Sequence, residues 1–380
     1  MAIKTRNSPT ENGIYGSSAR CTSCVLPRTA HGLGFDADGH CDLCTWANQL
    51  TALEKQEHYS EGNIDEVIAN IKLRGKNRRY DCIIGLSGGR DSSYMLYELV
   101  HKYNLRVLAA YYRTPFTPDT IDANVKRMVQ LLGVKLVRMN ISQKGHLKSA
   151  KKFALLWKSC PRPELINLMC ASCKFTNREV FRIARKYGVK SIVLGGSRYE
   201  SFQFGAIQIL KRKHEDSFAT QTLKGLKVVR RGLLLLLAHP SIISALPLAA
   251  AASLLYLVPH SVYLRMRYPD ILRIQYFRLA EWNEADCIAA LLQLGWKLPS
   301  GCKSYWKADC DMAEMKNIMF RRTMGLTHVD ALLSNMVRFG FISRDEALAR
   351  LEKEGEISYE RLKRLTDALG LPADFFNDIR

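Results

Sequence analysis

The sequence predicts a doubly wound parallel α/β sheet, with a cysteine-rich module before it and a helical region after it. Short apolar runs of strand length occur at residues 80–86, 106–112, 135–140 and 191–194, and helix-length sequence separates each run from the next. This alternation is typical of βαβ units around a parallel sheet. A glycine turn after the first run leads into a helical pattern at residues 94–100, which supports a strand, turn and helix there.

The chain has 380 residues, enough for two or three domains. We expect a zinc-ribbon module at residues 1–60, an α/β domain at 75–205, a hydrophobic helical insert at 206–272 and a helical region at 273–380. Within the last segment, Ser343 followed by Glu346 predicts a capped helix start.

The charge balance favours anionic partners, because 56 Lys and Arg residues oppose 36 Asp and Glu residues and give a formal net charge of +20. It does not choose among nucleotides, nucleic acid and an anionic membrane surface. The first twenty residues are polar and lack the apolar core of a secretory signal, so we expect a cytoplasmic protein. In a reducing compartment, the eleven cysteines are better explained by metal binding or catalysis than by disulfides.

A hydrophobic block at residues 232–264 contains no Asp, Glu, Lys or Arg. It is long enough to span a bilayer, but Pro240, Pro247 and Pro259 divide it into pieces shorter than one straight membrane helix. Two interpretations stay open. The block either makes peripheral or re-entrant contact with a membrane, or forms a buried helical pair or a partner interface.

Two CxxC pairs, Cys21 with Cys24 and Cys41 with Cys44, have the spacing of a four-thiolate zinc site. Between them, residues 34–39 predict a small hairpin with Asp38 and Gly39 in its turn. Four protein ligands leave no open coordination position, so the pattern favours structural Zn²⁺ in a ribbon.

A looser second set of thiols consists of one CxxC pair and isolated cysteines. It could form a second zinc site or an iron–sulfur cluster, or it could consist of buried inert thiols. The candidate ligands are Cys170, Cys173, Cys302 and Cys310.

The sequence Ser-Gly-Gly-Arg-Asp-Ser at residues 87–92 stands where the first strand leads into a helix. Glycines there allow a phosphate chain to approach the backbone, whose amides point at the anion together with the helix N-terminus. Asp91 would be repelled by bare phosphate, so we expect it to bind Mg²⁺ or to orient a donor. The candidates are Ser87, Gly88, Gly89, Asp91 and Ser92 for nucleotide binding, and Arg90, Asp91 and Ser92 for catalysis.

A second glycine turn follows the run at 191–194 and would lie at the same edge of the sheet. Its residues Gly195, Gly196 and Ser197 are further candidates for nucleotide binding. A plain solvated loop is the alternative.

Residues 87–92 resemble the SGGxDS signature of PP-loop ATP pyrophosphatases, which have an adenine nucleotide alpha hydrolase-like fold. This resemblance implies cleavage of ATP between the α and β phosphates and transfer of AMP to a carbonyl or amide oxygen. The chain contains no GxxxxGK[ST] motif, so transfer of the γ-phosphate is not expected.

The ribbon, the PP-loop signature, residues 169–173 and the run Trp-Lys-Ala-Asp-Cys at 306–310 together resemble the N-acetyl sugar amidotransferase family. Further similar stretches are residues 276–282, 294–299 and 333–348. The resemblance implies an ATP- and Mg²⁺-dependent conversion of a sugar acetamido group to an acetamidino group in the biosynthesis of bacterial surface polysaccharide, such as lipopolysaccharide O-antigen. It also implies two partners, a glutaminase subunit and an ammonia-channelling barrel subunit like those of imidazole glycerol phosphate synthase.

The main alternative is a tRNA-thiolating PP-loop enzyme, which also adenylates an oxygen but replaces it with sulfur. The positive net charge and the basic run at residues 211–214 suit nucleic acid, and Cys170 and Cys173 would then carry persulfide or a cluster. A second alternative is a non-enzymatic zinc-ribbon scaffold with a degenerate nucleotide fold. The intact residues of the 87–92 motif argue against that scaffold, and we take an acetamido sugar, not nucleic acid, as the expected substrate.

Overall fold

The computed structural model describes residues 20–45, 47, 63–196, 264, 266–372 and 374–376. Several sequence predictions concern residues outside these ranges. They are Ser197, the basic run at 211–214 and all of the hydrophobic block except Leu264.

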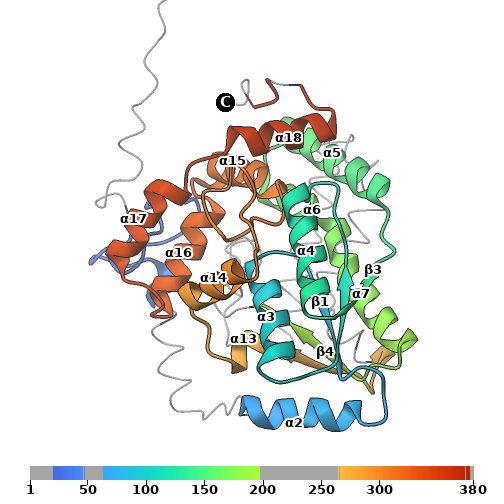
Figure 1. Ribbon diagram of the computed structural model, residues 1–380. Helices are drawn as coiled ribbons and strands as arrows, with labels where there is room; N and C mark the ends of the chain where they lie inside the picture. The colour runs from blue at the N-terminus through green and yellow to red at the C-terminus, as the bar shows by residue number, and fades with distance from the viewer. Residues whose placement is uncertain are drawn as a thin grey trace, which may run out of the picture.

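A five-stranded parallel sheet forms the centre of the molecule (Figure 1). Its spatial order is β3-β2-β1-β4-β5, so β2 and β3 are added on one side of β1, and β4 and β5 on the other, as in a doubly wound sheet. The predicted fold class is therefore confirmed. The strands are β1 (Cys82–Leu86), β2 (Val107–Tyr111), β3 (Lys135–Arg138), β4 (Ser191–Leu194) and β5 (Leu272–Gln275).

The sequence predicted the first four strands but not β5. This strand pairs with β4 in parallel, from Ser191 opposite Leu272 to Leu194 opposite Gln275. It is a four-residue edge strand in which a single residue, Ile274, is buried. Such a short and half-exposed strand leaves little hydrophobic signal. Its position means that sequence on both sides of the 197–263 segment builds one sheet.

Alternating side chains of the sheet enter two hydrophobic cores, one on each face. On one face, Ile84 and Leu86 of β1 pack with α2 (Ile64–Gly75) and α3 (Arg90–His101). On the other face, Ile83 of β1 packs with α7 (Ala171–Lys186). Because both faces are covered, β1 and β2 are almost entirely apolar, as expected for a parallel sheet.

Of the remaining helices, α4 packs beside α3 on the first face of the sheet, and those near the C-terminus lie over one end of it (Figure 1). Five of the remaining helices, namely α5, α14, α16, α17 and α18, begin at side-chain caps. Thr327 and Asp330 form a reciprocal capping box on α16, and Ser343 Oγ accepts a hydrogen bond from the Glu346 amide at the start of α17, as predicted. These helices are α4 (Asp119–Leu131), α5 (Gln143–Ser159), α6 (Pro163–Leu168), α13 (Tyr276–Leu279), α14 (Glu284–Gln293), α15 (Met312–Met324), α16 (His328–Arg338), α17 (Arg344–Glu354) and α18 (Tyr359–Leu369).

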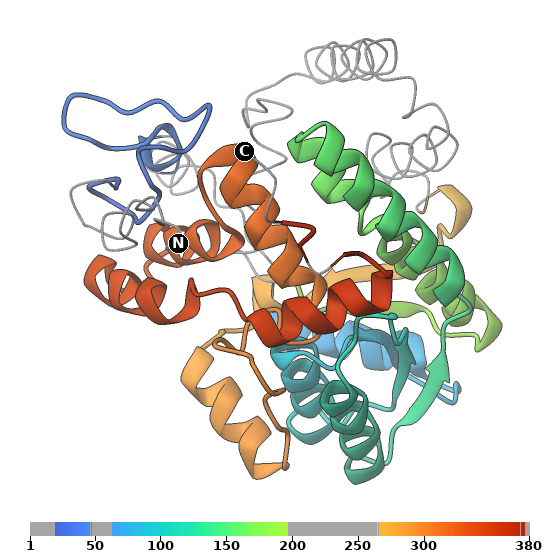
Figure 2. The same ribbon diagram turned by 90° about the horizontal axis from the view of Figure 1, so that it is seen from above.

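The cysteine module packs against α16 and α17, and Figures 1 and 2 show it beside these helices from two directions. Buried Arg20 forms a 2.7 Å ion pair with Asp330 of α16. From α17, Arg344 donates to the carbonyl oxygens of Cys21 and Cys24 at 3.1 and 3.2 Å. The two ends of the described chain therefore share one interface.

A buried ion cluster fixes the turn at residues 307–311, which precedes α15. Arg361 of α18 is 4% exposed and pairs with Asp311 at 2.8 Å and with Glu314 at 2.6 Å. Its guanidinium also donates to the carbonyl oxygens of Lys307 and Cys310. This residue therefore satisfies two carboxylates and two backbone acceptors at once, which holds the turn in place.

Within the described ranges, no helix combines the length and the apolar character needed to cross a membrane.

Truncation of Arg361 should destabilise the protein strongly. Arg361→Ala leaves the buried carboxylate of Glu314 without its cation, and the loss of one member of a buried pair typically costs about 3–5 kcal/mol. Urea denaturation of purified variants would measure the change. Lys363→Ala is the matched control from the same helix, because its pair with Asp367 is exposed and should contribute little. Equal losses in both variants would contradict the importance that we assign to Arg361.

Candidate nucleotide site and metal centre

The predicted phosphate loop joins β1 to α3 at the carboxyl edge of the sheet. Ser87 and Ser92 close it, because their hydroxyl oxygens lie 3.0 Å apart and Ser92 Oγ accepts a hydrogen bond from the Ser87 amide at 3.2 Å. The Gly89 amide donates to Ser87 Oγ at 3.2 Å. The serines and glycines of the motif thus form one compact turn at a helix N-terminus, the local structure that favours a bound anion.

Gly88 is required by the geometry of this turn. Its φ of +86° lies in the left-handed region, and a Cβ atom would come within 2.6 Å of Val125 and 2.7 Å of Ile121 in α4. Its carbonyl oxygen accepts a 3.0 Å hydrogen bond from the indole of Trp296. The backbone of the loop is therefore held from α4 on one side and from the C-terminal region on the other.

Arg90 lies under the loop and does not face solvent, being 3% exposed. Its guanidinium binds the Asp91 carboxylate, with Nε to Oδ1 at 2.7 Å, and also pairs with Glu284 of α14. The ring of Trp282 covers it, with the guanidinium carbon 4.9 Å from the ring centroid. Arg90 therefore joins the first turn of α3 to the C-terminal region.

The Asp91 carboxylate points toward Arg90 and Trp282. Besides Arg90, it accepts a 3.3 Å hydrogen bond from the Trp282 indole, and it does not line the cavity beside the loop. The sequence left open whether Asp91 binds Mg²⁺ or orients a donor, and its hydrogen bonds in this structure are of the second kind, with Arg90 and Trp282 as the donors.

The second glycine turn follows β4, next to the loop in the sheet. A Cβ atom on Gly195 would lie 3.5 Å from the sulfur of Met95 in α3, and one on Gly196 would lie 3.3 Å from Gln275 of β5. Both glycines therefore lie at the carboxyl edge, as predicted. Leu194 and Ser87 line the same cavity.

A cavity of about 510 Å³ opens beside the phosphate loop, a size in the usual range of small-molecule sites. One end is formed by β1 and Ser87, and the other by α7, α15 and the turn before α15. Its polar lining includes Ser87, Lys174, Lys307, Asp309, Lys316 and His328.

Three lysines of the cavity, Lys174, Lys307 and Lys316, lie close enough to influence one another. Burial, assisted by the charges of Lys316 and Lys307, lowers the pKa of Lys174. Burial and the same two lysines hold the pKa of His328 well below its usual range, so this imidazole is neutral at pH 7. The region suits an anionic group of a substrate.

The second set of cysteines is divided by the structure. Cys170, Cys173 and Cys310 line the cavity, but Cys302 packs in a separate apolar cluster near Trp296. The pKa of Cys170 lies well below its usual value because Cys173 hydrogen-bonds to its sulfur and Lys316 is close, whereas burial raises the pKa of Cys310 to about 12. Among the described residues, these four thiols do not converge on one metal position. Of the arrangements that the sequence left open, a site with all four thiols is not assembled in this structure, because Cys302 and Cys310 pack in different clusters.

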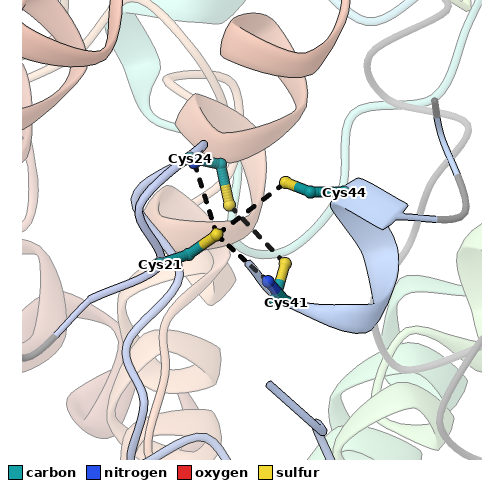
Figure 3. Close-up of side chains that lie close together, drawn as sticks. All are labelled: Cys21, Cys24, Cys41 and Cys44. Atoms are coloured by element: carbon teal, nitrogen blue, oxygen red, sulfur yellow. Dashed lines mark hydrogen bonds between the residues drawn. The ribbon is translucent and has the colours of Figure 1, made fainter. Parts of the chain in front are cut away.

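The N-terminal cysteines do converge. Figure 3 shows Cys21, Cys24, Cys41 and Cys44 with their sulfur atoms pointing toward one another. The sulfurs of Cys21 and Cys44 lie 3.9 Å apart, and those of Cys24 and Cys41 lie 3.8 Å apart. A tetrahedral ion with metal–sulfur bonds of about 2.3 Å requires sulfur separations of about 3.8 Å. All four residues are buried, and the set fits a single metal ion.

The surroundings favour a thiolate at Cys21, whereas the hydrogen bonds with Cys21 raise the pKa of Cys41 and of Cys44. Hydrogen bonds from the other three cysteines hold the pKa of Cys21 far below its usual value. Backbone amides of Cys24 and Cys41 donate to its sulfur, and Arg338 of α16 donates to the sulfur of Cys24 at 3.6 Å. The predicted hairpin is also present, with Gly39 at φ +81° and Phe35 bridged to Cys41.

Sequence reasoning missed the residues of the C-terminal region that reach the loop. Trp282 and Glu284 contact the Arg90 and Asp91 pair, Trp296 contacts Gly88, and Asp309 lies against Gly89. Three of them fall in stretches that supported the family resemblance, but nothing in their local pattern places them beside a loop some 200 residues earlier in the chain. The sequence therefore marked these stretches but did not show that they lie beside the phosphate loop.

Comparison with known proteins gives limited information. No family model matches the chain. A stretch of 179 residues is 24% identical to an uncharacterised protein of Methanocaldococcus jannaschii, and it covers 46% of this chain and 58% of that relative. Solved structures with a similar arrangement include NMN synthetase from Francisella tularensis, with a TM-score of 0.32, 11% identity and coverage of 82% of this chain and 94% of that one.

Another similar structure is the U34-tRNA thiolase NcsA from Methanococcus maripaludis with its [4Fe-4S] cluster, with a TM-score of 0.33 and 14% identity. It covers 91% of this chain and 95% of that one. Likenesses at this level do not assign a function to this chain.

Cys21→Ser should remove one metal ion per chain and destabilise the cysteine module, because the tetrahedral site loses a ligand. Elemental analysis of the purified protein measures the metal and identifies it. Cys82→Ala is the control, since this thiol is buried inside β1, away from the cluster. Unchanged metal content in Cys21→Ser would contradict the assignment.

Proposed function

We propose that this chain is an ATP pyrophosphatase that adenylates an amide oxygen of an acetamido sugar and lets ammonia displace AMP. The observation that carries the proposal is the Ser87–Ser92 loop. It matches the PP-loop signature, forms a compact turn at the carboxyl edge of a doubly wound parallel sheet, and opens on a cavity large enough for a nucleotide and part of a second substrate.

The loop would bind the β and γ phosphates, which leave as pyrophosphate. Backbone amides of the turn, the N-terminus of α3 and the hydroxyls of Ser87 and Ser92 are the donors for this anion. Mg²⁺, when bound with ATP, would neutralise charge on the phosphates. Adenylation is needed because an amide oxygen is a poor leaving group, whereas AMP leaves readily when ammonia attacks the carbon.

The acceptor part of the proposal rests on the family resemblance and on the cavity. Lys174 and Lys316 suit the phosphate group through which the sugar would be linked to a nucleotide or lipid carrier. The source of ammonia would be a separate glutaminase, delivering through a barrel subunit. We further propose Zn²⁺ for the four-cysteine centre, since four thiolates in tetrahedral array favour it and leave no open position for catalysis.

The specific observation that favours a second candidate, tRNA thiolation, is the position of three cysteines. Cys170, Cys173 and Cys310 line the same cavity as Ser87, where a sulfur-handling group would have to meet an adenylated base. Under this reading, Cys170 is the thiol best suited to carry sulfur, because its pKa is lowered and its thiolate is therefore populated.

Gly88→Ala should abolish AMP and pyrophosphate formation from ATP, because the new methyl group collides with Val125 and Ile121 and displaces the loop. Gly340→Ala is the matched control. It also has a positive φ, of +73°, but a Cβ there meets no atom within 4 Å. Pyrophosphate release is measured for both variants, so that the effect of displacing the loop is distinguished from the effect of strain at a positive φ. Full activity in Gly88→Ala would show that the loop takes no part in the reaction.

The acceptor is tested by incubating the purified chain with ATP, Mg²⁺ and an ammonium salt, and offering acetamido nucleotide-sugars or bulk tRNA. The proposal expects AMP formation that depends on the sugar, and mass analysis of the sugar should show a product about one mass unit lighter as NH replaces oxygen. AMP formation that depends on tRNA, with loss of the activity in Cys170→Ser when a sulfur donor is supplied, would support thiolation instead.

A further inference from the structure

Asp309 brings a carboxylate to the phosphate loop from the far end of the chain. A Cβ atom built on Gly89 would lie 3.3 Å from both Cγ and Oδ2 of Asp309, so the carboxylate is in contact with the loop backbone. Asp309 also lines the cavity that Ser87 lines. The motif's own aspartate, Asp91, is directed away into its pair with Arg90.

Asp309 differs from the other carboxylates of the cavity in its electrostatic surroundings. Glu314 is paired with Arg361, Glu354 with Arg350 and Glu356 with Lys303. Within the described part of the chain, no Lys, Arg or His nitrogen lies within ion-pair distance of the Asp309 carboxylate. An anionic side chain beside an anion-binding turn is unfavourable when the turn is filled by phosphate, unless a cation bridges the two.

The backbone around Asp309 is rigidly held. Lys307 has a left-handed φ of +55°, and its carbonyl oxygen, like that of Cys310, accepts a hydrogen bond from buried Arg361. The Asp311 amide donates to the Phe116 carbonyl oxygen at 2.9 Å. The backbone that carries Asp309 is therefore fixed beside the loop, which places its carboxylate there before a ligand arrives.

We propose that Asp309 is the protein ligand of the divalent cation that enters with the nucleotide. The inference rests on the proposed ATP pyrophosphatase function and gives the role of metal ligand to Asp309 in place of Asp91. A carboxylate oxygen and phosphate oxygens are the donors that Mg²⁺ prefers, and one carboxylate together with substrate phosphates is its usual mode of binding. Asp91 acts as a positioning residue for Arg90.

The test measures metal binding directly, using Mn²⁺ as a paramagnetic substitute for Mg²⁺. The full chain is mixed with α,β-methylene ATP, which the reaction cannot cleave, and free Mn²⁺ is followed by electron paramagnetic resonance. Asp309→Asn should weaken Mn²⁺ binding to the protein–nucleotide complex at least about tenfold. Asp309→Glu keeps the charge and should retain part of the affinity.

The matched control is Glu356→Gln, which removes another cavity carboxylate that is paired with Lys303 and should leave Mn²⁺ affinity unchanged. Circular dichroism and the metal content of the four-cysteine centre verify that each variant is folded. Binding of the same nucleotide in EDTA is measured in parallel, and Asp309→Asn should not weaken it.

Unchanged metal affinity would overturn the inference, and a chain that binds no nucleotide would overturn the proposed function. Unchanged Mn²⁺ affinity in Asp309→Asn would exclude Asp309 as a ligand, most directly if Asp91→Asn abolishes Mn²⁺ binding instead. If Asp309→Asn binds the nucleotide more tightly in EDTA and its metal affinity is unchanged, the carboxylate only competes with phosphate for the loop and does not bind the metal. If the unaltered chain binds no nucleotide with or without metal, the proposed function itself fails, and that result is distinguishable from the first two.

Discussion

The burial of one guanidinium, that of Arg90, constrains how the two halves of the candidate site fit together. A charge that is almost fully removed from water is tolerated only if it is paired. Asp91 supplies one carboxylate from the next position, but the second comes from Glu284, almost 200 residues later. Satisfying Arg90 thus requires α14 to lie against the first turn of α3. Once α14 is there, Trp282 covers the guanidinium and Trp296 reaches the Gly88 carbonyl.

Further ion pairs lead from Glu284 toward the N-terminal module. Glu284 also pairs with Arg350 at 2.6 Å, and Arg350 pairs with Glu354 in the same helix, α17. The first turn of α17 carries Arg344, which holds the carbonyl groups of the first CxxC pair. A continuous series of charged contacts and one helix therefore connects the phosphate loop to the metal centre, although the two are distinct sites.

Short-range patterns in the sequence were sufficient for much of this structure. Runs such as residues 80–86 and 191–194 predict strands, because burial on both faces of a sheet requires continuous apolar sequence. The CxxC spacing predicts a metal site, because its ligands lie on two tight turns. The roles of Asp91 and Asp309 could not be read in this way. Which carboxylate faces the cavity depends on a buried arginine and on a turn held by Arg361, and both are consequences of long-range packing.

The docking of the cysteine module has a consequence for how the protein is made. With the proposed Zn²⁺ bound, the four thiolates would carry a net charge of about −2 beside Arg338, with Arg344 on the adjoining carbonyl groups. Without an ion, the four adjacent sulfurs cannot all stay ionised, because the pKa values of Cys41 and Cys44 are raised, and the cationic side chains of α16 and α17 are then compensated less. Chains synthesised under metal starvation would then reach the cell's quality-control proteases with the C-terminal helices improperly seated, so the supply of metal during translation would set the yield of mature protein.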